Sequence, residues 1–222
     1  MNILLVYGHD DPTSFTAAMH NMAQGVLTQA GHEVVVTDLY GVGFHPTAER
    51  YDFTTLSGDH YNYLHEQEVA AAHDWAYAPD IVEEIQKVKA ADVILFHFPL
   101  WWHAPPAIVK GWLDRVLTKG TAHDAEHIYS TGMYRGKAAG VAVCVGDPES
   151  YYRSDGVHKA SVQQMLYPLL HGTLAYCGFN VFEPFVAYGM NTANEYANEE
   201  QLRDYRTRLE KIEQFPHFIY KY

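Results

Sequence analysis

This sequence has little that would suit a disulfide-bonded, membrane-spanning or nucleic-acid-binding protein. Its 2 cysteines, Cys144 and Cys177, are too few for a disulfide framework and suit a reducing, cytoplasmic location. No apolar run approaches the roughly 20 residues that a membrane-spanning helix needs, and MNILLVYGHD is expected to form a first strand and not a signal peptide. With 15 basic and 27 acidic residues and no Lys/Arg cluster, the net charge of −12 disfavours nucleic-acid binding.

Several well-defined motifs are also missing. Neither GxGxxG nor GxxxxGK followed by Ser or Thr occurs, which disfavours an ordinary dinucleotide-binding Rossmann domain and a Walker-type NTPase. A GxSxG elbow for a serine hydrolase is absent too. His123 and His127 have i,i+4 spacing, but they lie in a loop sequence without the HExxH pattern, so we expect no metal site.

Short apolar runs alternate with amphipathic segments along the chain. NILLVYG is typical of a buried parallel strand, and SFTAAMHNMAQGVLTQAG spaces apolar residues at helical intervals. A strand–helix–strand unit of this kind implies a parallel sheet with a right-handed crossover. We predict strands at 2–8, 32–40, 92–98, 137–146 and 179–189, and helices at 14–31, 79–90, 105–117, 160–178 (bent at Pro168) and 199–215.

Two segments are long for connections and lack a clean period. Residues 41–78 are expected to contain one helix near 62–72, and residues 118–136 to form an irregular loop. No repeat or linker interrupts the pattern, so residues 1–222 are expected to form a single domain. Strands that alternate with helices predict an α/β fold, a doubly wound five-stranded parallel sheet in a three-layer α/β/α sandwich.

Three elaborate loops follow the first, third and fourth predicted strands, at 9–16, 99–104 and 145–158. Parallel strands bring their carboxyl ends to one edge of the sheet, and ligands bind there in doubly wound folds. The three loops are therefore expected to share one ligand-binding edge.

The first loop leads into a helix through Ser14, Phe15 and Thr16. The N–H groups and hydroxyls at such a helix start favour a phosphate. The same residues are also typical of a helix cap that binds nothing. The local sequence leaves both interpretations open.

The second loop contains Trp101 and Trp102, which are adjacent and cannot face the same way on an extended segment. We expect at least one indole to face the loop side and offer a flat apolar wall, while Trp112 belongs to the core. The prolines of this loop leave main-chain groups without strand partners. His103 is expected to line the same cavity or to cap the next helix.

The third loop contains Tyr152 and His158, which can converge across a turn at Asp155–Gly156. A phenol and an imidazole can both donate protons and stabilise developing negative charge. Both residue types are also common in surface loops, so the pair alone is weak support for a catalytic role.

The stretch FPLWWHAPPAIVKGWLDRVL resembles the flavodoxin-like NAD(P)H:quinone oxidoreductase family, whose pattern is FPLxWxxxPAxLKGWxDRVF. VYGHDDPTSF is similar to the family's first-loop flavin motif, and YYRSDGVH to its Tyr-x5-His element. LYPLLHGTLAYCGFNVFEPFVAYG resembles its fourth helix and fifth strand. The resemblance covers nearly the whole chain and implies a flavodoxin-like fold.

The resemblance implies a flavin, FAD with FMN as the alternative, bound at the interface of a homodimer. NAD(P)H would give a hydride to flavin N5 and leave, and a quinone would then take its place and receive two electrons, a ping-pong mechanism. Tyr152 and His158 would be catalytic, and Trp102, His103 and His158 would bind substrate. The implied flavin-binding residues are His9, Ser14, Phe15, Thr16, Gln67, Pro99, Leu100, Trp101, Trp102, His103, Cys144, Val145, Gly146, Asp147 and Tyr152.

Two departures from the family pattern concern the expected site. The family usually has Thr-Thr-Gly-Gly where this chain has Cys144-Val145-Gly146-Asp147, so flavin contacts there must use main-chain N–H groups. Asp147 also adds a negative charge that would disfavour a reduced, anionic flavin nearby. The position of His103 is commonly Phe, which changes the polarity of the pocket.

Two other functions fit the same resemblance. Some family members are ancillary regulatory subunits of potassium-efflux membrane systems, and such a protein would need an exposed surface for its membrane partner. A flavodoxin-type electron carrier is the other alternative. It prefers an exposed flavin edge, and the long segments 41–78 and 118–136 argue against it because they should enclose the ring.

Overall fold

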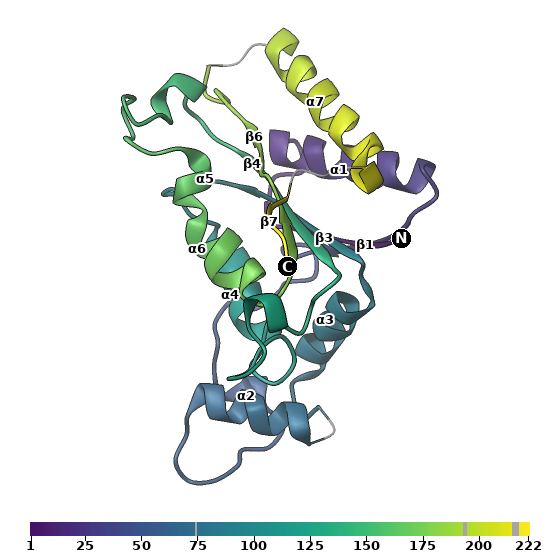
Figure 1. Cartoon of the computed structure of the whole chain (residues 1–222), viewed down its shortest axis with the longest axis vertical. Helices are drawn as coiled ribbons and strands as arrows, with labels where there is room; N and C mark the ends of the chain where they lie inside the picture. The colour runs from purple at the N-terminus through teal and green to yellow at the C-terminus, as the bar shows by residue number, and fades with distance from the viewer. Residues whose placement is uncertain (74, 193–194, 215–217) are drawn as a thin grey trace.

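A mostly parallel sheet runs through the centre of the computed structural model, which describes residues 1–73, 75–192, 195–214 and 218–222 (Figure 1). The strand order is β2-β1-β3-β4-β5-β7, and β6 also pairs with β4. This order starts from the first strand and extends in both directions, so the predicted doubly wound sheet is confirmed. The bounds of the first four strands are β1 Asn2–Tyr7, β2 Glu33–Asp38, β3 Val93–Pro99 and β4 Ala138–Cys144.

The prediction of five parallel strands was wrong in two respects. The predicted strand at 179–189 is divided into β5 (Asn180–Phe182) and β6 (Phe185–Ala187), which both pair parallel to β4. Pro184 lies between them, and proline has no N–H to continue a ladder. A further strand, β7 (Phe218–Tyr220), adds antiparallel to β5 at the edge.

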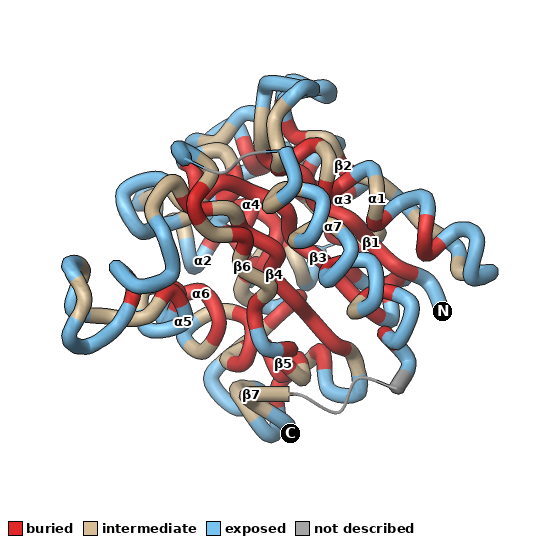
Figure 2. The backbone as a smooth tube through the Cα atoms, turned by 90° about the horizontal axis from the view of Figure 1, so that it is seen from above, coloured by how far each residue is buried: buried red, intermediate tan, exposed pale blue. Residues whose placement is uncertain are grey.

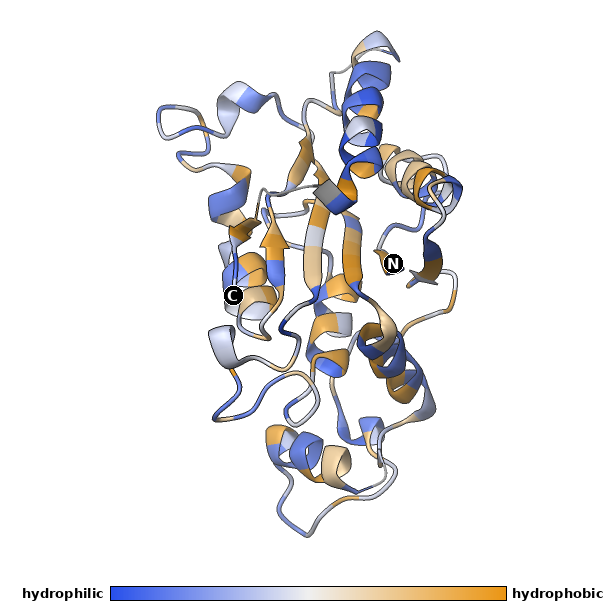
Figure 3. Cartoon of the chain, turned by 45° about the vertical axis from the view of Figure 1, so that its right-hand side comes forward, coloured by the Kyte–Doolittle hydropathy of each residue, from blue (hydrophilic) through white to orange (hydrophobic). Residues whose placement is uncertain are grey.

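Helices cover both faces of the sheet, and each face has its own apolar cluster. Figure 2 shows buried main chain concentrated in the strands, and Figure 3 shows apolar central strands beside the largely hydrophilic α7. Among the described residues, no helix is both long and apolar enough to span a bilayer. One face carries α1 (Phe15–Gln29) and α7 (Glu195–Glu210); the other carries α3 (Pro79–Ala90), α4 (Ala107–Val116), α5 (Val162–Met165) and α6 (Tyr167–Leu169).

Two predicted helices differ from the observed ones. The segment predicted as 160–178 is broken into α5, α6 and a π-helical stretch η4 (Leu170–Ala175), because Pro168 interrupts the hydrogen-bond ladder. The last helix begins at Glu195 instead of 199, and a short 3₁₀ turn, η5 (Ile212–Gln214), follows it. Phe215, the predicted end of that helix, lies outside the described residues.

The two long segments contain little regular structure. Residues 41–78 hold a 3₁₀ turn, η1 (Arg50–Asp52), and α2 (Tyr63–Ala72), close to the helix predicted near 62–72. Asn62 caps α2 by accepting a hydrogen bond from the His65 N–H at 3.1 Å. Residues 118–136 are irregular apart from the 3₁₀ turn η2 (Tyr129–Thr131).

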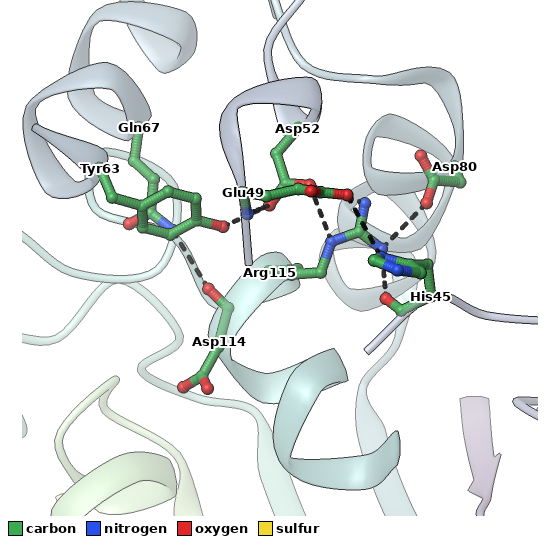
Figure 4. A network of polar contacts seen from close by, with 8 residues as sticks. All are labelled: His45, Glu49, Asp52, Tyr63, Gln67, Asp80, Asp114 and Arg115. Carbon is green, nitrogen blue, oxygen red and sulfur yellow. Dashed lines mark hydrogen bonds and ion pairs between the residues drawn. The ribbon is translucent and has the colours of Figure 1, made fainter. Parts of the chain in front are cut away.

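Arg115 of α4 ties segment 41–78 to the core (Figure 4). Its Nε donates to Asp52 at 3.0 Å, and its Nη1 donates to the His45 carbonyl at 2.8 Å and to Asp80 at 3.1 Å. Asp52 also accepts from the Tyr63 hydroxyl at 2.6 Å. Burial alone would lower the pKa of Arg115, but the bonds to Asp52 and Asp80 outweigh it and raise the pKa. The charged groups of this network are therefore fully paired despite their burial.

Candidate functional site at the carboxyl edge of the sheet

The loop after β1 contacts both other loops at the carboxyl edge. His9 packs edge-on against the indole of Trp101, with ring centroids 5.9 Å apart. Thr16, in the first turn of α1, places its hydroxyl 2.9 Å from the sulfur of Cys144 at the end of β4. Burial raises the pKa of the Cys144 thiol, so this group is protonated at neutral pH. The predicted meeting of the loops at one edge is present.

The two adjacent tryptophans begin a tight two-residue turn. Trp101 and Ala104 exchange main-chain hydrogen bonds of 3.1 and 3.0 Å. Trp102 and His103 lie between them with φ angles of 50° and 59°, a left-handed conformation that is costly, by about 1–2 kcal/mol, for residues with a Cβ. The turn leaves Trp102 96% exposed and Trp101 46% exposed. Strained turns of this kind cluster at functional sites.

The third loop brings Tyr152 and His158 together as predicted from the turn. The Gly156 N–H closes that turn on the Arg153 carbonyl at 3.0 Å, and the rings of Tyr152 and His158 lie 4.6 Å apart. His103 of the second loop lies 4.8 Å from His158, ring to ring. One phenol and two imidazoles from two loops therefore form one cluster.

Asp147 adds a carboxylate to this cluster. Its Oδ2 lies 3.1 Å from Nε2 of His158. Burial raises the pKa of the Tyr152 phenol, and the negative charge of Asp147 raises it further. The Tyr152 hydroxyl therefore remains protonated at neutral pH and is available as a proton donor.

The main chain at 145–147 is held by the segment that follows β6. The carbonyl groups of Val145, Gly146 and Asp147 accept hydrogen bonds from the main chain of 189–191. A Cβ at Gly146 would lie 2.3 Å from Nδ2 of Asn191, so a larger residue at 146 would require the exposed Asn191 side chain to move. Within the described chain the N–H groups of Gly146 and Asp147 have no hydrogen-bond partner. These are the main-chain donors that the loss of the two threonines led us to expect.

At the start of α1, different groups correspond to the two interpretations of the sequence, a helix cap and a phosphate site. The Ser14 hydroxyl accepts from the Ala17 N–H at 3.1 Å, so its side chain is a helix cap. The hydroxyl of Thr16 is buried and lies against the sulfur of Cys144. The Phe15 N–H has no hydrogen-bond partner among the described residues, and a phosphate at this helix start stays a prediction.

Gln67 does not join the cluster. Its side-chain amide donates to the Asp114 carbonyl at 3.1 Å and accepts from the Lys119 N–H at 3.0 Å, which fastens α2 to the end of α4. In Figure 1, α2 lies at the bottom of the view, and the loop between β4 and α5 lies at the upper left. Gln67 is thus part of the protein's internal packing.

The remaining predicted residues occupy the joint between β3 and β4. Pro99 ends β3 and is buried, and the Leu100 N–H donates to the Cys144 carbonyl at 3.0 Å. Sequence reasoning missed Tyr188, whose ring lies 5.7 Å from that of Tyr152. Tyr188 lies near the carboxyl end of the strand predicted at 179–189, and that position is the signal that could have placed it at this edge.

The arrangement suits a flat, electron-accepting ring. Exposed indoles offer stacking surface, unpaired N–H groups offer hydrogen bonds to ring oxygens and nitrogens, and a protonated phenol beside an imidazole can exchange protons. In the part of the chain that the structure describes, no group of three or more His, Cys, Asp or Glu is arranged to hold a metal ion.

Comparison with known proteins agrees with this chemistry. Residues 1–212 match a family model described as a flavodoxin-like fold. A Mus musculus protein named ribosyldihydronicotinamide dehydrogenase (quinone) is 38% identical over 95% of this chain and 91% of its own length. NAD(P)H dehydrogenase (quinone) 1 from Cavia porcellus is 38% identical over 94% of this chain and 76% of its own.

A solved structure from Klebsiella pneumoniae, named a putative quinone reductase, superposes on this chain with a TM-score of 0.91 at 34% identity. The superposition covers 97% of this chain and 86% of that one. The resemblance inferred from the sequence motifs is confirmed by these matches.

Proposed function

The chain belongs to the family with the flavodoxin-like fold that residues 1–212 match, and we propose that it is a flavin-dependent NAD(P)H:quinone oxidoreductase. The observation that carries the proposal is the cluster of Tyr152, His158 and His103, which joins two loops at the carboxyl edge. Similar proteins named quinone dehydrogenases align over 94–95% of the chain and support the proposal.

The residues at this edge fit a flavin. The N–H groups of Gly146 and Asp147 are unpaired in the described chain and would hold the polar edge of its ring. The turn of Trp101 and Trp102 would provide the apolar wall, and the free N–H of Phe15 would bind phosphate. A bound flavin supplies the two-electron chemistry that amino-acid side chains lack.

The chain's own residues would place the substrates and manage protons. The Tyr152 phenol, whose pKa is raised by burial and by nearby Asp147, stays protonated and can donate a hydrogen bond to an oxygen that gains negative charge. His158 exchanges a proton beside it. His103 lines the pocket with an imidazole, and the exposed Trp102 ring covers one side of the substrate.

We further propose FAD as the flavin, a ping-pong order of substrates, a homodimer with the flavin at its interface and a cytoplasmic location. The first three rest on the resemblance. Gln67 and Asn62 do not help to choose the flavin, because their side chains form hydrogen bonds within the protein. The location is supported by two free cysteines, Cys144 and Cys177. We also propose that residues 1–222 act as one domain.

The test is to purify the chain, release its cofactor by denaturation and identify it by chromatography. Steady-state assays with NADH and NADPH against a small quinone panel follow. We expect bound FAD, quinone-dependent oxidation of NAD(P)H and parallel double-reciprocal plots. A protein that takes up neither FAD nor FMN would refute the proposal. One that binds flavin but reduces no quinone would favour the carrier or the regulatory subunit.

A further inference from the structure

Asp147 and His158 form a fixed pair at the rim of the site. The side chains are joined by the 3.1 Å contact between Oδ2 and Nε2, and they are 41% and 18% exposed. Both main chains are anchored, because the Asp147 carbonyl accepts from the Gly189 N–H at 2.9 Å and the His158 N–H donates to the Tyr151 carbonyl at 3.0 Å. The Asp147–His158 contact therefore joins two residues whose main chains are fixed by hydrogen bonds.

The other groups that face His158 are rings. His103, Tyr152 and Tyr151 lie 4.8, 4.6 and 6.0 Å from it, measured between ring centroids. Among the described residues, Asp147 is the carboxylate that bonds to this imidazole. The family that the sequence resembles has glycine at this position, so the carboxylate is a departure made by this chain.

An ionised carboxylate has acceptors and no donor, so the nitrogen that faces it must carry a hydrogen. Nε2 of His158 is that nitrogen. In the neutral imidazole only one nitrogen bears a hydrogen, which leaves Nδ1 as the free acceptor. The partner of one ring nitrogen thus decides which nitrogen takes part in proton exchange.

We propose that Asp147 is a positioning residue that fixes His158 as the Nε2–H tautomer, so that His158 takes up and releases its proton at Nδ1. The catalytic consequence rests on the proposed oxidoreductase function, whereas the tautomer itself does not. Asp147 acts through His158 and also keeps Tyr152 protonated, since its charge raises the pKa of the phenol. Carboxylate, imidazole and phenol then form one ordered proton-handling group.

The first test is structural and needs no turnover. Nitrogen-15 spectra of histidine-labelled, flavin-free protein at neutral pH should show His158 protonated at Nε2 alone. Asp147→Ala should give a mixture of both tautomers. Asp147→Asn, which retains a side-chain oxygen as acceptor, should keep the Nε2–H form. A wild-type Nδ1–H tautomer would refute the proposal, as would spectra of the alanine variant that match the wild type.

The second test uses the holoenzyme, with Glu149→Ala as the matched control. Glu149 carries the same charge on the same loop but contacts the exposed Arg153 at 3.6 Å. We expect Asp147→Ala to lower kcat on the order of 10-fold, with KM and flavin content retained, which is less than the 10²–10⁴-fold typical of an acid–base group itself. Glu149→Ala should keep the wild-type kcat. If both variants lost kcat equally, the effect of Asp147 would come from the negative charge of the loop and not from its contact with His158.

The two tests separate failure of this inference from failure of the proposed function. If the protein reduces no quinone, the tautomer of His158 in the flavin-free chain still decides whether Asp147 positions it. If quinone reduction is present and the tautomer does not depend on Asp147, the oxidoreductase stands and the positioning role is wrong.

Discussion

The network around Arg115 and the loops at the carboxyl edge are both rich in polar groups, but they differ in how many of those groups are paired. Arg115 and Asp52 are almost completely buried, and their polar atoms bond to protein partners. At the carboxyl edge, main-chain donors at Phe15, Gly146 and Asp147 have no partner within the described chain. Paired groups hold segment 41–78 in place, and unpaired groups are available to a ligand.

The largest expected effect comes from breaking the paired region. Arg115→Met should lower the free energy of unfolding by about 3–5 kcal/mol, because Asp52 would remain buried without its cationic partner. Urea denaturation followed by circular dichroism measures the change. Lys110→Met removes an exposed pair with Asp114, joined at 2.6 Å, and should change stability by less than about 1 kcal/mol. If both variants lost similar unfolding free energy, the buried Arg115–Asp52 pair would be no more important for stability than an exposed pair.

The second effect concerns activity at the unpaired region. Tyr152→Phe and His158→Ala should each lower kcat/KM by about 10²-fold, since each removes a proton-handling group. Flavin content and unfolding free energy should stay near the parent values. Tyr51→Phe and His60→Ala, at exposed positions outside the cluster, serve as matched controls. Variants of Tyr152 and His158 that turn over at the parental rate would remove these residues from the mechanism.

The third prediction uses pH to destabilise the interior around His97, a buried imidazole with one hydrogen-bonded ring nitrogen. Burial lowers the pKa of His97 well below its ordinary value, and its Nε2 lies 2.7 Å from the Tyr205 hydroxyl. The unfolded chain therefore binds this proton first, so stability is full above the ordinary histidine pKa and falls as pH drops below it. Between pH 7.5 and 5.5 we expect a loss of roughly 1.4 kcal/mol from this residue.

Unfolding free energies at the two pH values measure this loss. His97→Gln cannot titrate and should show a smaller pH difference than the parent. Buried His20, whose pKa burial also lowers, retains its own contribution in both proteins. An unchanged pH difference in the variant would show that His97 does not titrate in this range.

The smallest effect tests the strained turn. Trp102→Gly should raise the free energy of unfolding by about 0.5–1 kcal/mol, because glycine accepts a positive φ without strain and the exposed indole contributes little packing. Flavin affinity should fall, since one stacking wall is lost. Thermal unfolding of flavin-free protein and a flavin titration measure the two changes. A loss of stability would mean that the turn is not strained.

Much of the fold was readable from the sequence because its elements are local. Strands 1 to 4 follow apolar runs, α3 begins at Pro79, and Trp112 is buried as expected, with its indole N–H bonded to Glu84 at 2.8 Å. The strand β7 could not be predicted, since its 3 residues are too few to show alternation. Its pairing depends on contact with β5, which lies far away in the sequence.

The sequence predicted which loops form the site, but not which side chains in them bond to one another. The positions of Trp101, Tyr152 and His158 followed from strand ends and turn residues. Their partners did not, because Asp147 reaches His158 only through the folded path of the third loop. The Arg115–Asp52 pair lacked a signal for the same reason, since the two residues lie on different segments 63 positions apart.

Gly146 sets a limit on how this edge can change in evolution. The side chain of Asn191 occupies the space where a larger residue at 146 would put its first carbon, so substitution there requires this exposed side chain to move. Position 147 already carries a side chain, which lies 3.1 Å from His158. Larger residues should therefore be accepted more readily at 147 than at 146, and libraries that seek new acceptor preferences are best randomised first at 147.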